Sequence, residues 1–126
     1  MTGSDPIPSP DFEAAALRLL KRNSGTRPKI EDVARVLGCT AVELRRNYAR
    51  HDRFLNNLFG TGRVVATPRL ALSYACVRYA AQLIRQGWKI EAARRQAGFH
   101  HKRAFNRQFV GFFGCLPSEY RARSMR

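Results

Sequence analysis

The sequence has 126 residues, which is enough for one compact domain or for two very small ones that share a connecting element. It carries 23 Lys and Arg against 9 Asp and Glu, a net charge of +14, and 44% of its residues are hydrophobic. The apolar content excludes a disordered basic tail, and the charge indicates a polyanionic partner. Because the sequence shows neither a leader pattern nor an apolar run of about twenty residues, we expect a cytoplasmic chain with no membrane partner.

The basic residues are mostly arginine, and acids become scarce along the chain, since only Glu91 and Glu119 occur after Arg53. The planar guanidinium group suits phosphate groups and guanine edges, so this bias favours nucleic acid as the partner. A GC-rich genome also raises arginine content, but it does not account for the shortage of acids.

The sequence contains no pattern that indicates catalysis or metal binding. We find no Ser-His-Asp arrangement, no glycine-rich phosphate loop and no paired carboxylates on one helix face, so we expect no enzyme activity, no metal and no cofactor. The cysteines lack metal-ligand spacing and lie in apolar stretches, which is typical of buried thiols in a reducing compartment. They are Cys39, Cys76 and Cys115.

Residues 1–10 are rich in Pro, Gly and Ser and predict an untethered tail. A helix is predicted from there to Lys21, with Asp11 as its N-cap. Its apolar residues recur at helical spacing and define one face. They are Phe12, Ala15, Ala16, Leu19 and Leu20.

Two segments then nearly repeat each other, because Lys29–Gly38 reads KIEDVARVLG and Lys89–Gly98 reads KIEAARRQAG. Each predicts a short amphipathic helix, a glycine that takes positive φ in a tight turn, and a second helix. We expect the crossing helices to approach closely at Ala34 and Gly38. A helical hairpin of no special purpose gives a similar pattern, but two copies in so basic a chain favour two helix-turn-helix units.

In the first unit, Thr40 is predicted to cap a helix over Ala41–Arg50, with Leu44 and Tyr48 facing inward. The outer face of this helix is formed by Ala41, Val42, Arg45 and Arg46.

In the second unit the turn is one residue longer, and the predicted helix runs over Lys102–Gly111 with Phe105 and Phe109 facing inward. Donor-rich side chains of the kinds that read base edges occupy its outer face, although an ordinary solvated basic face has the same composition. These side chains are Lys102, Arg103, Asn106 and Arg107.

Between the units, Pro68 predicts the start of a long helix that reaches about Gln86 and ends at Gly87. Eighteen residues at ~1.5 Å each span roughly 27 Å, which approaches the ~34 Å of one turn of B-DNA. Such a helix could hold two recognition helices in successive major grooves. The preceding segment 52–67 suggests a further helix turn and a loop.

The C-terminal part closely resembles the signature of AraC/XylS-type transcription regulators. The resemblance is carried by IEAARRQAGF over 90–99, FNRQF over 105–109 and GCLPSEYR over 114–121, with matching spacing. The first unit, 30–48, looks like the weaker N-terminal helix-turn-helix of that family. The chain is similar to its short stand-alone members or to an excised DNA-binding domain of a longer one.

This resemblance implies a bipartite double-stranded DNA site, control of transcription through RNA polymerase, and no small-molecule effector on this chain. Its base-reading positions correspond to Val42, Arg45, Arg46, Lys102, Arg103, Asn106 and Arg107. Residues near the helix starts and turns are predicted to contact phosphate. These are Lys29, Thr40, Lys89, Arg94 and His101.

Three features depart from the family pattern. The stretch from Tyr48 to Pro68 is roughly a dozen residues longer, Arg94 stands where a small residue is usual, and Cys76 stands where arginine is usual. Because long side chains reach toward solvent from partly buried positions, we expect Arg94 to turn outward, near the phosphates.

We therefore predict an all-α fold of two helix-turn-helix subdomains joined by a long linker helix. The predicted divisions are a tail over 1–10, a first subdomain over 11–67, a linker helix over 68–87 and a second subdomain over 88–126. The predicted function is sequence-specific regulation of transcription. Two alternatives stay open, a nucleic-acid-binding protein without sequence preference and a protein-interaction co-regulator that uses segment 52–67.

Overall fold

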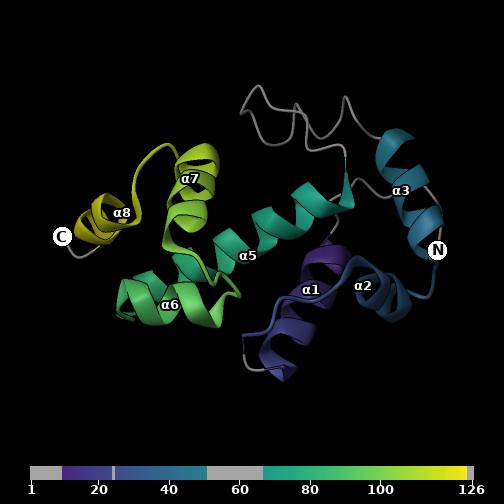
Figure 1. Ribbon diagram of the computed structural model, residues 1–126, viewed down its shortest axis with the longest axis horizontal. Coiled ribbons are helices and arrows are strands. Elements are labelled where there is room, and N and C mark those ends of the chain that lie inside the picture. The colour runs from purple at the N-terminus through teal and green to yellow at the C-terminus, as the bar shows by residue number, and fades with distance from the viewer. Residues whose placement is uncertain (1–9, 24, 51–66, 125–126) are drawn as a thin grey trace. The chain divides into compact units, whose positions relative to one another are not determined.

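The computed structural model describes residues 10–23, 25–50 and 67–124 (Figure 1). Within these ranges it contains seven helices and no β-strand, which confirms the predicted all-α fold class. The helices are α1 (Pro10–Arg22), α2 (Ile30–Leu37), α3 (Ala41–Arg50), α5 (Pro68–Arg85), α6 (Ile90–Gln96), α7 (Lys102–Phe113) and α8 (Pro117–Ser124).

The helix ends follow the sequence signals with small differences. Helix α1 begins at Pro10, so Asp11 lies in its first turn and is not the N-cap. An acid in the first turn still interacts favourably with the helix dipole. Helix α5 begins at Pro68 as predicted and ends at Arg85, two residues before Gly87.

The chain divides into two compact units. The first contains α1 up to Leu19, helices α2 and α3, and the start of α5 up to Leu72. Helix α2 packs against α3. The predicted apolar face of α1 is buried except at Leu19, which is half-buried. The buried apolar side chains of this unit include Phe12, Ala15, Ala16, Val33, Ala34, Leu44, Ala71 and Leu72.

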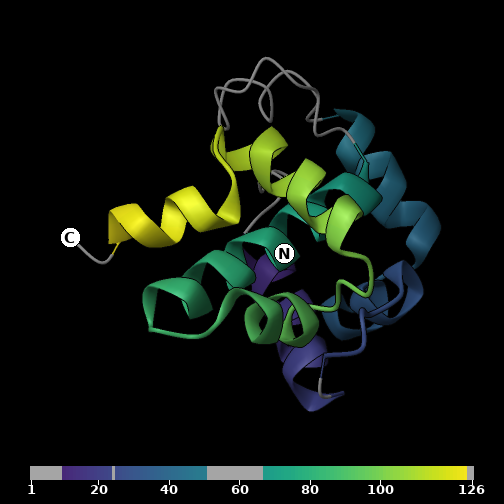
Figure 2. The same cartoon turned by 60° about the vertical axis from the view of Figure 1, so that its left-hand side comes forward.

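The second unit contains residues 20–27, the rest of α5 from Ser73, and helices α6 to α8. Both views show α7 crossing α5 (Figures 1 and 2), and the rings of Tyr74 and Phe112 meet at 4.9 Å between these helices. Phe105 and Phe109 are completely buried on the inner face of α7. This confirms the predicted inward face of the second helix-turn-helix.

An aromatic cluster fastens α7 inside the second unit. Phe109 lies at the centre, with ring centroids 5.7 Å from Phe105, 4.9 Å from Phe113 and 5.4 Å from Tyr120 of α8. Phe105 in turn contacts Phe99 of the preceding turn at 5.1 Å. Pairs of aromatic rings stabilise a fold by more than the burial of their area alone, so the cluster holds α7 between the turn at Phe99 and α8.

The repeat glycines adopt the positive φ that the sequence predicts, 78° at Gly38 and 86° at Gly98. The expected close approach at Gly38 is wrong, because a Cβ built there has no neighbour within 4 Å. At Gly98 the same Cβ would lie 3.2 Å from Cβ of Arg27. Gly38 is thus required for backbone conformation alone, while Gly98 is required for conformation and for space.

The remaining sequence expectations concern the cysteines, membrane spanning, Tyr48 and segment 52–67. Cys76 and Cys115 are buried, Cys39 is only half-buried, and all three thiols are free. Among the described residues, no helix is both long and apolar enough to cross a membrane. Residues 52–66 and the side chain of Tyr48 lie outside the described residues.

Candidate nucleic-acid interface

Thr40 caps α3 through a reciprocal pair of hydrogen bonds with Glu43. The Thr40 N–H donates to Oε1 of Glu43 at 3.0 Å, and the Glu43 N–H donates to Oγ1 of Thr40 at 3.1 Å. Hydrogen bonding from the backbone N–H of Thr40, and then from its side chain, lowers the pKa of the Glu43 carboxyl. The arrangement is a capping box, which fixes where α3 begins. It confirms Thr40 as the N-cap that the sequence predicts.

The outer face of α3 presents the three side chains predicted to read bases in the first unit. Val42 is 58% exposed, and Arg45 and Arg46 are exposed as well. On the opposite face Leu44 is buried. Nη2 of Arg45 lies 4.0 Å from Oε2 of Glu31 in α2. An exposed pair at this distance holds the arginine weakly, so Arg45 can exchange the carboxylate for another acceptor.

Helix α7 presents the corresponding set in the second unit. Lys102, Arg103 and Arg107 are exposed, and Asn106 is half-buried. No acidic residue lies in the first turn of this helix, and its N-cap His101 makes no side-chain capping bond. The exposed side of α7 is therefore cationic from its first residue, while the buried side is aromatic.

The remaining predicted phosphate contacts lie at helix starts. Lys29 and Lys89 occupy the N-cap positions of α2 and α6, and neither makes a side-chain capping bond. Both are exposed, as are Thr40 and His101. An exposed cation beside the free N–H groups of a helix start is a suitable partner for an anion.

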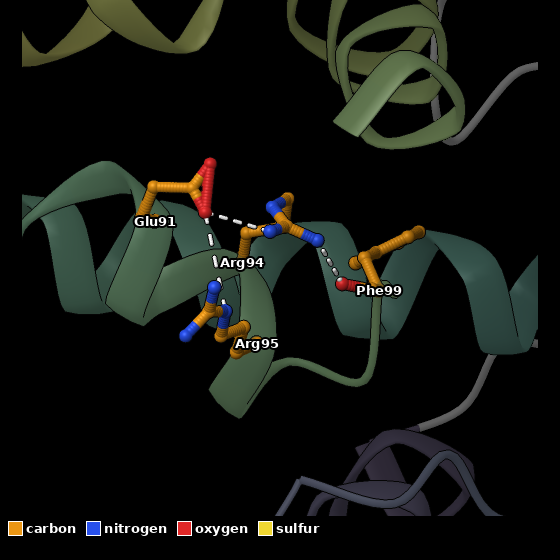
Figure 3. Close-up of polar contacts among 4 residues, drawn as sticks. All are labelled: Glu91, Arg94, Arg95 and Phe99. Atoms are coloured by element: carbon orange, nitrogen blue, oxygen red, sulfur yellow. Dashed lines mark hydrogen bonds and ion pairs between the residues drawn. The ribbon is translucent and has the colours of Figure 1, made fainter. Parts of the chain in front are cut away.

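The expectation that Arg94 turns outward is wrong. Arg94 is only 7% exposed, and its guanidinium lies between two acceptors inside the second unit (Figure 3). Nη1 donates to the carbonyl oxygen of Phe99 at 2.7 Å, and Nη2 donates to Oε2 of Glu91 at 2.6 Å. Local acceptors hold the charge more favourably than an extended path to solvent would, so the side chain stays inside.

Sequence reasoning missed two residues that support the second unit. Glu91 receives the Arg94 bond, which lowers the pKa of the Glu91 carboxyl, and the charges of Arg94, Arg95 and Lys102 lower it further. Its spacing of three residues from Arg94 on one helix was a visible signal. Arg27 places its guanidinium carbon 5.7 Å from the Phe99 ring centroid. Nothing in the sequence links these two distant residues.

Among the described residues, no group of three or more His, Cys, Asp or Glu side chains is arranged to hold a metal ion. Burial raises the pKa of the Cys76 thiol to about 11, with the charge of Arg27 acting in the opposite direction. Cys76 is therefore a protonated core residue at neutral pH and stands apart from the exposed cationic side chains.

Comparison with known proteins decides the family. A helix-turn-helix domain model of AraC type matches residues 55–123, which is more than half of the chain. The chain belongs to the AraC-type helix-turn-helix family. The match confirms the family that the C-terminal motifs indicate, and members of this AraC-type family are DNA-binding transcription regulators.

A solved structure shares the fold of this chain. The chain is similar to the crystal structure of a DNA-binding transcriptional dual regulator from Escherichia coli K-12, with a TM-score of 0.64 and 20% sequence identity. The similarity covers 97% of this chain and 98% of that chain. At this identity it shows a shared fold. No protein in the curated set matches the sequence significantly.

Proposed function

We propose that this chain is a sequence-specific transcription regulator that reads a bipartite site in double-stranded DNA with α3 and α7. The division of α7 into two faces carries the proposal, because Phe105 and Phe109 are completely buried while Lys102, Arg103 and Arg107 are exposed. A helix fastened by aromatic rings on one side and cationic on the other can enter a major groove with its core contacts intact. The family supports this assignment.

The proposed base contacts follow from side-chain chemistry. Arginine donates two parallel hydrogen bonds to a guanine edge, asparagine does so to adenine, and an aliphatic side chain packs on a thymine methyl group. We therefore assign the guanine contacts to arginines of both helices, an adenine contact to Asn106 and an apolar contact to Val42. The arginines concerned are Arg45, Arg46, Arg103 and Arg107.

The proposed phosphate contacts fix the position of each helix without selecting sequence. Lys29 and Thr40 would serve the first unit, and Lys89 and His101 the second, since all four are exposed at helix starts or turns. Arg94 is not part of this set, because its guanidinium is occupied inside the unit.

Other parts of the proposal rest on the family and on the sequence patterns described above. They are contact with RNA polymerase, a cytoplasmic location, and regulation without a small-molecule effector, a cofactor or a catalytic step on this chain. The two half-sites are proposed to lie roughly ten base pairs apart, one turn of the duplex.

Binding-site selection from random duplexes tests the proposal. The dissociation constants of a selected duplex and of a shuffled duplex of equal length are measured at the same salt concentration. We expect the selected duplex to bind about 10³-fold more tightly or better. Equal affinities would instead establish binding without sequence preference. Absence of DNA binding, with a protein partner that co-purifies, would establish the co-regulator.

A further inference from the structure

At one buried position the two repeats differ in charge. Ala34 in the first repeat corresponds to Arg94 in the second, and both are buried, at 1% and 7% exposure. Alanine fills such a position with a methyl group, whereas a guanidinium brings a charge that is unfavourable there unless it is hydrogen-bonded. The second repeat therefore needs hydrogen-bond acceptors around this position, and the first repeat does not.

One of the acceptors that Arg94 needs lies in the longer second turn. In both repeats the residue after the glycine returns its N–H to the helix, from Cys39 to the Ala34 oxygen at 3.0 Å and from Phe99 to the Arg94 oxygen at 3.1 Å. In the second turn a side chain also binds the carbonyl of the same residue, because Arg94 donates to the Phe99 oxygen at 2.7 Å. A buried carbonyl needs such a partner. Arg94 thus forms hydrogen bonds with both the N–H and the C=O of Phe99.

Glu91 orients the guanidinium from the other end. Its Oε2 accepts from Nη2 of Arg94 at 2.6 Å, while Nε of the neighbouring Arg95 lies 4.0 Å away (Figure 3). The Arg94 side chain is 8% exposed and the Arg95 side chain is 76% exposed. One arginine is therefore fixed inside the turn, and the next shares the same carboxylate from the surface.

A second arginine, Arg27, also contacts this turn. The backbone of Arg27 lies against Gly98, whose added Cβ would be 3.3 Å from both N and Cα of Arg27. Its guanidinium covers the Phe99 ring and donates to Oγ of Ser73 at 2.5 Å. Phe99 passes this constraint to α7, because its ring contacts that of Phe105.

We propose that Arg94, together with Arg27, is a positioning residue that sets the angle and depth at which α7 meets DNA. This rests on the proposed function, in which α7 reads bases. Arg94 touches no base or phosphate in this proposal. It fixes the Phe99 peptide, Phe99 fixes Phe105, and the first turn of α7, with Lys102 and Arg103, is held in one orientation.

The test compares R94M with R95M in the full chain. Each variant removes one positive charge from α6, so the two variants have the same net charge. We expect R94M to reduce base discrimination at the positions that α7 reads by about fivefold or more, and to leave the α3 half-site unchanged. R95M should weaken binding to all sequences alike. Equal base-frequency profiles for the two variants would overturn the proposal.

A second variant covers the case in which R94M does not fold. E91Q keeps Arg94 and its bond to Phe99 but removes the carboxylate that orients the guanidinium. We expect a partial loss of discrimination, about twofold or more and again confined to the α7 half-site. An E91Q profile identical to that of the wild-type protein would contradict the orienting role.

A readout without DNA separates this proposal from the proposed function. If the wild-type protein shows no base preference, the proposed function fails, and amide hydrogen exchange then decides the role of Arg94. We expect R94M, but not R95M, to lose protection at least about tenfold at Phe99 and Phe105. Equal protection in the two variants would show that Arg94 does not position the turn.

Discussion

The two repeat glycines allow the backbone and packing contributions to stability to be separated within one chain. Gly38 and Gly98 share a left-handed conformation, with φ of 78° and 86°. An alanine in this conformation is strained by about 1–2 kcal/mol, partly offset because alanine restricts the unfolded chain. We expect Gly38→Ala to lower the free energy of unfolding by about 1 kcal/mol, since its Cβ would project into open space.

Gly98→Ala should be more damaging. Its Cβ would lie 3.2 Å from Cβ of Arg27 and 3.3 Å from Cα and N of the same residue, so a backbone segment must move. Overpacking of this kind costs about 1–3 kcal/mol beyond the conformational strain, which gives a total loss of roughly 2–4 kcal/mol.

Urea unfolding followed by circular dichroism measures both effects in parallel. Asparagine tolerates the left-handed region, so Gly38→Asn should come close to the wild-type stability, whereas Gly98→Asn should not, because its Cβ meets Arg27 as well. If the two alanine variants lose the same stability, or if Gly98→Asn restores it, the packing argument at Gly98 is refuted.

Four further predictions follow. Thr40→Ala should lower the free energy of unfolding by about 1 kcal/mol in urea titrations, since it removes the side-chain half of the α3 capping box. Cys76, whose pKa burial raises to about 11, should resist a thiol-specific disulfide reagent at about pH 8 in the folded protein and react at once in urea. Because the pKa of Glu91 is lowered in the folded protein, its carboxylate contributes fully to stability at pH values above its ordinary pKa of 4.5. This contribution is lost as the pH falls through the lowered pKa. The stability difference between wild type and E91Q should therefore be larger at about pH 6 than at about pH 3. DNA affinity should fall by roughly 10³–10⁵ between about 50 and about 200 mM salt if six to ten phosphates are contacted, and a shallow dependence would indicate a protein partner.

The helices of the second unit could be predicted because local patterns determine them. The spacing of Phe105 and Phe109 places both rings on one side of α7, and that side is buried. Pro68 likewise marks the first residue of α5. These signals lie within one turn of the feature that they specify, so no tertiary information is needed to read them.

The environment of Arg94 could not be predicted in the same way. The sequence shows a long cationic side chain at a position of small residues, and reaching outward is the usual solution for such a side chain. What decides otherwise is the Phe99 carbonyl, which the turn aims at the guanidinium. Backbone orientation in a turn is a tertiary property that helical periodicity does not report.

Gly38 and Gly98 illustrate the same limit. Their local sequences follow the same pattern, and both predict a turn with positive φ, which both adopt. Only Gly98 is crowded, because Arg27, far away in the sequence, packs against it. Local sequence therefore specified the conformation of both residues but not the contact at one of them.

Base-frequency profiles of alanine variants test whether α3 and α7 read bases directly. Site selection is repeated with Arg103→Ala and Arg107→Ala on α7, with Arg45→Ala on α3, and with Lys89→Ala as the phosphate control. If the two helices read bases directly, each α7 variant should relax the preference at one or two base pairs in one half-site. Arg45→Ala should do so in the other half-site, roughly ten base pairs away, and Lys89→Ala should lower affinity without changing preference. A uniform loss of affinity in all four variants, with no change at any base position, would contradict direct readout by the two helices.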